Sequence, residues 1–138
     1  MDYEEFTRLM IADMRAHAGQ VTQGPMAGKS LLLLTTKGAK SGADRTAIIT
    51  WSRDGDRYVI AASKSGAPEN PAWFHNLKAN PEATVEEGGE TFRARATEAT
   101  GAERDRLWEL HTQKLPEFLE YPKKTSRVIP MLFLDRIS

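Results

Sequence analysis

The chain has 138 residues, 40% of them hydrophobic and 28% charged, which is typical of one folded domain spanning residues 1–138. Its basic and acidic residues balance to a net charge of zero, which argues against a general nucleic-acid binder. The absence of cysteine excludes disulfides and thiolate metal sites and fits a cytoplasmic protein, and no run approaches the roughly 20 apolar residues that span a bilayer.

The first predicted element is an amphipathic helix over residues 3–17, within an N-terminal segment 1–19. Asp2 and Glu5 have the spacing of an N-cap and its return partner, and apolar residues then recur at helical spacing. Three glycines and a proline predict a loop after it. Because its polar face is largely acidic, we expect this helix to cover one barrel opening or to touch a membrane surface weakly.

A sheet is predicted to begin after this loop, in the part of the chain from residue 28 to 138. The apolar run 31–36 reads as a buried strand, and 46–51 reads as the next one across a loop of Gly, Lys and Ser. Asp54-Gly55 is a strong hairpin signal, and 58–62 returns as its partner.

A short helix and a second hairpin are predicted next. Asn70 is expected to cap the helix, with Pro71 in its first turn and Asn80-Pro81 at its end. Residues 83–87 and 91–97 then form a hairpin around Gly88-Gly89.

The last third of the chain should hold a helix, an irregular segment and a final strand. Thr100 and Glu103 have the spacing of a capping box, and the following helix is expected to bury Leu107. Two prolines bracket an irregular stretch at 116–122, and 128–134 reads as the last strand. Strands joined by hairpins predict a mainly β, antiparallel sheet with flanking helices, closed into a barrel to hide its edges.

The loop between the first two strands could hold an anion. Residues 35–46 contain two glycines, and the loop brings together the cations Lys37, Lys40 and Arg45. Glycines let backbone N–H groups face an anion, and arginine can grip a phosphate through two parallel hydrogen bonds. The stretch lacks the order of a Walker loop, and a solvated basic hairpin loop stays open as the alternative.

The stretch 61–81 could hold a flat ring. Small residues let a ring lie on the strand backbone, Lys64 could neutralise charge, and the N–H groups of the helix after Asn70 could meet an anion. The alternative is a strand, a turn and a capped helix with Trp73 in the core.

Other reactive side chains carry weaker signals. The three histidines are far apart, so no metal site is predicted, and His75 is expected to lie in the core. Tyr121, a phenol in a proline-rich segment, can donate a proton while its ring packs against a substrate.

Two blocks of this sequence resemble the deazaflavin (F420)-dependent nitroreductase family, also described as F420-dependent quinone reductases. The first is Gly38-Ala39-Lys40-Ser41-Gly42 with Arg45, and the second runs from Ala61 to Pro81. A weaker match covers 125–130. The resemblance implies a split β-barrel of the flavin-reductase and pyridoxamine-oxidase type.

The resemblance also implies the coenzyme contacts. The phosphodiester of coenzyme F420 would lie against the first block, and the deazaflavin ring against the strand of the second, with an asparagine of the following helix near the ring. The implied coenzyme-binding residues are Lys37, Lys40, Ser41, Gly42, Arg45, Ala61, Ala62, Ser63, Lys64 and Asn76.

The acceptor pocket is expected at the proline-rich segment, where the family carries several tyrosines. Here Phe118 stands where a substrate-facing tyrosine is expected, and Tyr121 remains. Tyr121 and Ser63 are the candidate proton donors, with solvent as a third source.

The resulting prediction is an F420-dependent oxidoreductase that passes a hydride to a small organic acceptor such as a quinone, enone or lactone, as a monomer or homodimer. Two alternatives stay open: a non-catalytic protein that binds or stores F420 or a flavin, and an oxidase of the same barrel class that uses flavin mononucleotide (FMN).

Overall fold

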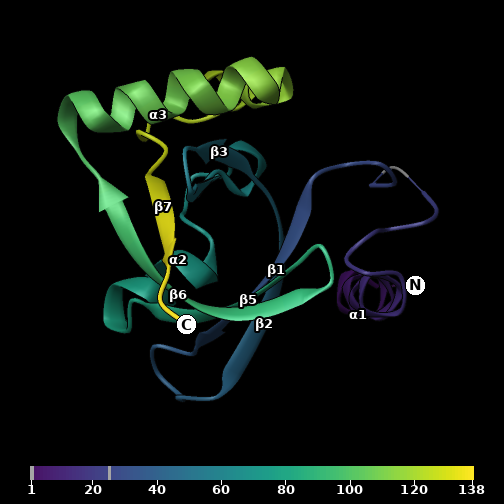
Figure 1. Ribbon diagram of the computed structural model, residues 1–138. Coiled ribbons are helices and arrows are strands. Elements are labelled where there is room, and N and C mark those ends of the chain that lie inside the picture. Colours follow the sequence, from purple (N-terminus) through teal and green to yellow (C-terminus); the bar gives the residue numbers. More distant parts are fainter. Residues whose placement is uncertain (1, 25) are drawn as a thin grey trace.

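The computed structural model describes residues 2–24 and 26–138 and contains a seven-stranded antiparallel sheet with helices around it (Figure 1). The strands are β1 (Leu31–Lys37), β2 (Asp44–Thr50), β3 (Ser52–Asp54), β4 (Arg57–Ala61), β5 (Glu82–Glu87), β6 (Glu90–Ala99) and β7 (Met131–Arg136). The α-helices are α1 (Tyr3–Ala16), α2 (Ala72–Ala79) and α3 (Gly101–Lys114), and the 3₁₀ helices are η1 (Lys64–Gly66) and η2 (Pro116–Lys123). The predicted mainly β class is confirmed.

The sheet curls because its two edge strands are nearly continuous in the chain. The strand order is β2-β1-β5-β6-β7-β4-β3, so β2 and β3 lie at opposite edges although only Trp51 separates them. Trp51 donates its backbone N–H to the carbonyl of Ser30 at 3.2 Å, at the point where the chain passes from one edge to the other. This connection turns the sheet into the half-barrel expected for a split-barrel protein.

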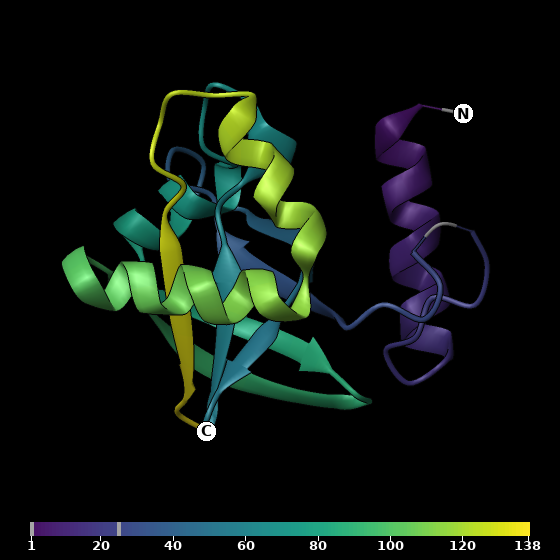
Figure 2. The same ribbon diagram turned by 90° about the horizontal axis from the view of Figure 1, so that it is seen from above.

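Both faces of β1 are covered, which explains its unbroken run of leucines. Leu32 and Leu34 point into the barrel core, while Leu31 and Leu33 pack on the other face against Met14 of α1. A strand buried on both faces has no polar side to alternate with. Helix α1 therefore lies on the outer face of β1 and β2, at one side of the sheet in Figures 1 and 2, and the expectation that it covers a barrel opening is wrong.

Three local predictions in the last third of the chain are also corrected. Thr100 is the N-cap residue of α3, but its side chain makes no capping hydrogen bond, and the Glu103 carboxylate of the predicted capping box pairs with Arg57 and Arg106. The segment 116–122 is helical. The last strand begins at Met131 rather than at residue 128, after the carbonyl of Pro130 has accepted a hydrogen bond from Ala62.

Candidate functional site

The basic loop, residues 38–43, connects β1 to β2 and is closed by its own backbone. Gly38 donates its N–H to the carbonyl of Ala43 at 2.7 Å, and Gly42 donates to the carbonyl of Gly38 at 2.8 Å. Gly42 has a φ of 71°, a conformation that strains residues with a Cβ, and an added Cβ there would meet no atom within 4 Å. The loop is therefore an open, shaped turn.

Two of the three predicted cations at this loop are free. Lys40 and Arg45 are exposed, and within residues 2–24 and 26–138 neither has a carboxylate within salt-bridge distance. Lys37, by contrast, pairs with Asp44 at 2.6 Å. Lys40 and Arg45 can thus bind an external anion without breaking an ion pair inside the protein. Lys37 can do so only if its ion pair with Asp44 breaks.

Asn76 anchors the basic loop to helix α2. Its side chain is only 6% exposed; its Oδ1 accepts from the N–H of Ala39 at 2.9 Å, and its Nδ2 donates to Oγ1 of Thr36 at 3.0 Å. Both ends of the amide are thus used inside the protein. The structure gives Asn76 a positioning contact in addition to the ring contact that the family implies.

The second predicted stretch forms a left-handed turn, residues 63–66, directly after β4. Ala61, Ala62 and Ser63 are buried, at 7%, 0% and 8% exposed. Ser63 is right-handed helical, and Lys64 and Ser65 follow with positive φ angles of 46° and 53°. A right-handed residue followed by a left-handed one points successive N–H groups toward one concavity, an arrangement that binds anions and carbonyl oxygens.

The three N–H groups of this concavity, those of Ser63, Lys64 and Ser65, have no acceptor in the part of the chain that the structure describes. The Lys64 ammonium itself reaches Glu69 at 2.7 Å. Ser63 is buried while Lys64 and Ser65 are exposed, so the concavity is open at the surface and these donors can meet a ligand or water.

Arg127 holds the other side of this turn, and sequence reasoning assigned it no role. Its guanidinium donates four hydrogen bonds of 2.7–3.0 Å, to the carbonyls of Ala62, Ser63 and Ala67 and to Oδ1 of Asn70. Asn70 is therefore not the N-cap of α2; Pro71 takes that position without a side-chain hydrogen bond. The only sequence signal for Arg127 was its place in the weaker family match.

Helix η2 packs closely against the left-handed turn, as Figure 2 shows at the top of the view. A Cβ on Gly66 would lie 3.0 Å from both the carbonyl oxygen of Tyr121 and the Cβ of Lys124. The Tyr121 ring is partly exposed, and its hydroxyl makes no hydrogen bond with the described residues. The fold thus brings Tyr121 beside the turn that carries Ser63.

Phe118 lies deeper than a substrate-facing residue. It is 7% exposed, packs in the cluster beneath α3 and η2, and meets the Tyr121 ring edge-on at 5.1 Å. It can shape a pocket through the position of Tyr121.

The buried histidine is His111 rather than His75, which is exposed. His111 is fully buried, its Nδ1 lies 2.6 Å from Oγ of Ser52, and its ring meets Phe118 edge-on at 4.6 Å. Burial, together with the nearby charge of Lys114, lowers the pKa of His111 to about 4. It is neutral at physiological pH and serves the core beneath η2.

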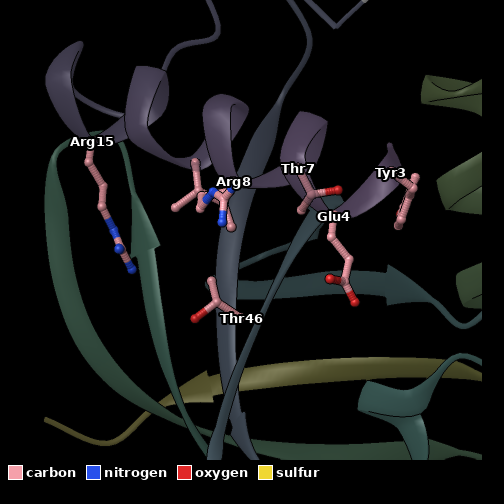
Figure 3. A pocket seen from close by; sticks show the side chains of 7 residues that line it. Tyr3, Glu4, Thr7, Arg8, Arg15 and Thr46 are labelled. Carbon is pink, nitrogen blue, oxygen red and sulfur yellow. The ribbon is translucent and has the colours of Figure 1, made fainter. Parts of the chain in front are cut away.

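A cavity of about 360 Å³ lies away from these residues, between α1 and β2 (Figure 3). Its lining includes Tyr3, Arg8 and Ile11 of α1 and Thr46 of β2. Side chains alternate along a strand, so Thr46 faces α1 while Arg45 faces the opposite side of the sheet. None of the predicted coenzyme or acceptor residues lines this cavity.

The fold is a half-barrel with the features of a cofactor-binding protein. It carries a cationic loop and a turn that presents backbone N–H groups, and α2 follows the turn and holds the loop through Asn76. This donor set suits a molecule with a phosphodiester and a flat ring that carries carbonyl oxygens. Small side chains precede the turn, and no cluster of metal-ligating side chains occurs in the described residues. No helix among those residues is long and apolar enough to cross a membrane.

Comparisons with known proteins place the chain in a family. It belongs to the F420H(2)-dependent quinone reductase family, whose sequence model matches residues 6–135. The F420H(2)-dependent quinone reductase Rv1261c of Mycobacterium tuberculosis is 37% identical over 135 residues, which cover 96% of this chain and 91% of that protein. The resemblance inferred from the sequence is therefore confirmed.

Solved structures agree with this assignment. An F420-H2 dependent reductase, FDR-A, superposes with a TM-score of 0.70 at 36% identity, covering 77% of this chain and 94% of its own. A domain-swapped dimer superposes with a TM-score of 0.73 at 30% identity, covering 97% and 100%. A pyridoxamine 5′-phosphate oxidase-type protein from Listeria innocua shares the fold alone, with a TM-score of 0.55 at 12% identity and coverage of 95% and 93%.

Proposed function

We propose that this protein transfers a hydride from reduced F420 to a small organic acceptor of the quinone, enone or lactone type. The observation that carries the proposal is a pair of donor sets without partners among the described residues: the cations Lys40 and Arg45 at the basic loop and the N–H groups of residues 63–65. Asn76 joins them, because it lies on the helix that follows the turn and holds the loop.

The basic loop would hold the phosphodiester of F420. Arg45 can donate two parallel hydrogen bonds, Lys40 adds a point charge, and Lys37 stands close behind. The hydroxyl of Ser41 already accepts from the N–H of Ala43 at 3.2 Å, so its own hydrogen is free to donate. Gly42 keeps the approach open.

The ring would lie on the backbone of Ala61, Ala62 and Ser63, where the side chains are small and buried. The N–H groups of Ser63 and Lys64 would donate to the carbonyl edge of the ring, and the Lys64 ammonium would offset charge there. When bound, reduced F420 supplies the hydride.

The protein must also deliver a proton to the acceptor oxygen. Tyr121 is suited to this because its phenol is partly exposed, has no hydrogen-bond partner among the described residues and lies beside the turn. Ser63, at 8% exposed, is the second candidate. Phe118 would set the angle of the Tyr121 ring by packing against it.

Absorbance and titration test the coenzyme assignment. The purified protein is titrated with F420 and with FMN, and turnover is then measured with reduced F420 and menadione. F420 binding with menadione reduction supports the proposal. Binding without turnover, on any of a panel of quinones, enones and lactones, supports a storage protein. A yellow protein that holds FMN and ignores F420 supports the oxidase alternative.

We also propose that the protein forms a homodimer through α1. Tyr3, Phe6 and Leu9 are 82%, 40% and 50% exposed on this helix, and Tyr3 also lines the adjoining cavity. A relative at 30% identity is a domain-swapped dimer. Light scattering on a sizing column should give twice the mass of the chain, and a monomer across the micromolar range contradicts this.

A further inference from the structure

We propose that Arg127 is a positioning residue for the coenzyme ring. Its guanidinium holds the left-handed turn so that the N–H groups of Ser63 and Lys64 stay free for the ring. This inference rests on the proposed function, and it assigns a task to a side chain that lies on the opposite side of the turn from those donors.

The turn does not hold its own shape. Lys64 and Ser65 both have positive φ angles, which cost residues with a Cβ, and Gly66 continues with a φ of 84°. Two backbone hydrogen bonds close the turn, from Gly66 to the carbonyl of Ser63 and from Ala67, directly after the turn, to the carbonyl of Lys64. Strained backbone of this kind persists when surrounding contacts over-determine it.

Arg127 supplies those surrounding contacts. Its Nε donates to the carbonyl of Ala67 at 2.9 Å, and its Nη1 and Nη2 donate to the carbonyls of Ala62 at 3.0 Å and Ser63 at 2.7 Å. The carbonyls of Ala62 and Ser63 share their peptide units with the N–H groups of Ser63 and Lys64, so these two N–H groups point away from the guanidinium. The guanidinium thus fixes the orientation of these peptide units, with their carbonyl oxygens on its own side of the turn and their N–H groups on the opposite side.

A lysine could not do this. The four acceptors of Arg127 belong to Ala62, Ser63, Ala67 and Asn70, and only a planar fork reaches acceptors spread over such a length of chain. An ammonium has three donors at one point, so Arg127→Lys keeps the charge and loses the geometry.

The test compares Arg127→Lys with Arg104→Lys. Arg104 donates two hydrogen bonds, at 3.1 and 2.9 Å, to the carbonyl of Ile129 in the same segment but makes none to the turn, so it is a matched control. Two quantities are measured well below the unfolding temperature: the Kd for F420, and the amide chemical shifts of residues 63–66 without coenzyme.

We expect Arg127→Lys to raise the Kd for F420 by roughly tenfold or more, the effect of losing a charge-assisted hydrogen bond network, and to shift the amides of residues 63–66. Arg104→Lys should change both by little. A parent protein that binds F420 together with an Arg127→Lys variant of equal affinity overturns this inference alone. A parent that binds no F420 overturns the proposed function and this inference with it.

Asn70 provides a second, milder test in case Arg127→Lys does not fold. Its Oδ1 accepts from Nη1 of Arg127 at 2.7 Å and orients the fork. Asn70→Ala should weaken F420 binding several-fold, and Asn70→Asp, which keeps an acceptor oxygen, should restore it. If both variants bind as the parent does, Arg127 does not act through this geometry.

Discussion

At the residue scale, Arg45 and Lys37 look alike in the sequence and differ in the structure. Lys37 forms an ion pair with the Asp44 carboxylate. Arg45 makes only a long hydrogen bond of 3.4 Å, to the backbone carbonyl of Asp44. We expect Arg45→Ala to weaken F420 binding by about 1.5–3 kcal/mol, the value of a hydrogen bond to a charged group, and Lys37→Ala to weaken it less. Calorimetric titration of these two variants and of Lys40→Ala checks the difference, and equal affinities in the parent, Arg45→Ala and Lys40→Ala would remove the basic loop from the site.

Tyr121 should matter for turnover and little for binding. Its hydroxyl is unpaired within the described residues, so Tyr121→Phe removes no internal hydrogen bond and leaves the packing against Phe118. Loss of a general acid costs about 10²–10⁴-fold in rate, and water reaching an exposed phenol favours the low end. Stopped-flow reduction of menadione should therefore slow while the Kd for F420 stays constant. An unchanged rate on every acceptor would assign the proton to Ser63 or to solvent.

His111 should make the protein sensitive to mild acid. Its folded-state pKa, about 4, lies below the ordinary value of 6.5, so the unfolded chain binds the proton more tightly. Stability from the neutral imidazole is full above pH 6.5 and is lost as the pH falls toward 4, by about 3 kcal/mol at most. Urea titrations between these pH values should show the slope in the parent and a smaller one in His111→Asn, which can still face Ser52. Equal slopes would mean that His111 does not set this sensitivity.

At the scale of elements, Gly66 allows η1 and η2 to touch. A Cβ there would lie 3.0 Å from the carbonyl oxygen of Tyr121 in η2 and from the Cβ of Lys124 directly after it, and the φ of 84° strains any residue but glycine. Left-handed strain and overpacking each cost about 1–2 kcal/mol, so Gly66→Ala should destabilise the protein by about 2–4 kcal/mol and weaken F420 binding. Gly55→Ala, with a φ of 62° and no atom within 4 Å, is the control for strain alone. Equal losses in the two variants would show that the close approach is unimportant.

Elements specified by local sequence were predicted well. Asp2 caps α1 through a 2.8 Å hydrogen bond from the N–H of Glu5. Asp54-Gly55 forms the hairpin turn between β3 and β4. Both were expected, because the residues involved are close neighbours in the chain. The capping box at Thr100 did not form, and the Glu103 carboxylate pairs instead with Arg57, 46 residues away, and with Arg106. A local pattern cannot report a competing contact that only the folded chain creates.

The candidate site divides in the same way. The glycines and cations of the basic loop are visible in the sequence because one short segment carries them. The contacts of Arg127 join residues 57–65 positions apart, and the burial of His111 depends on Ser52, 59 positions away. Such contacts have no sequence period, so a single chain without its fold does not reveal them.

At the scale of the whole molecule, the β1–β2 hairpin has two faces with different tasks. One face packs under α1 through Met14, Leu31 and Leu33, and the other faces the barrel and the anchor of the basic loop, Asn76. Because a strand separates these two sets of contacts, damage under α1 should reach the coenzyme site only through unfolding.

Met14→Ala tests this separation. Met14 is fully buried between α1 and the sheet, and removing a buried methionine side chain costs about 2–5 kcal/mol. We expect a lower unfolding temperature, while the Kd for F420, measured where the variant is fully folded, stays within about twofold of the parent.

The control is Leu34→Ala, which removes a buried side chain of similar size from the barrel core on the other face. It should lower stability similarly and weaken F420 binding as well, since β1 leads directly into the basic loop. If Met14→Ala weakens F420 binding as much as Leu34→Ala does, the two faces are coupled, and α1 belongs to the coenzyme site.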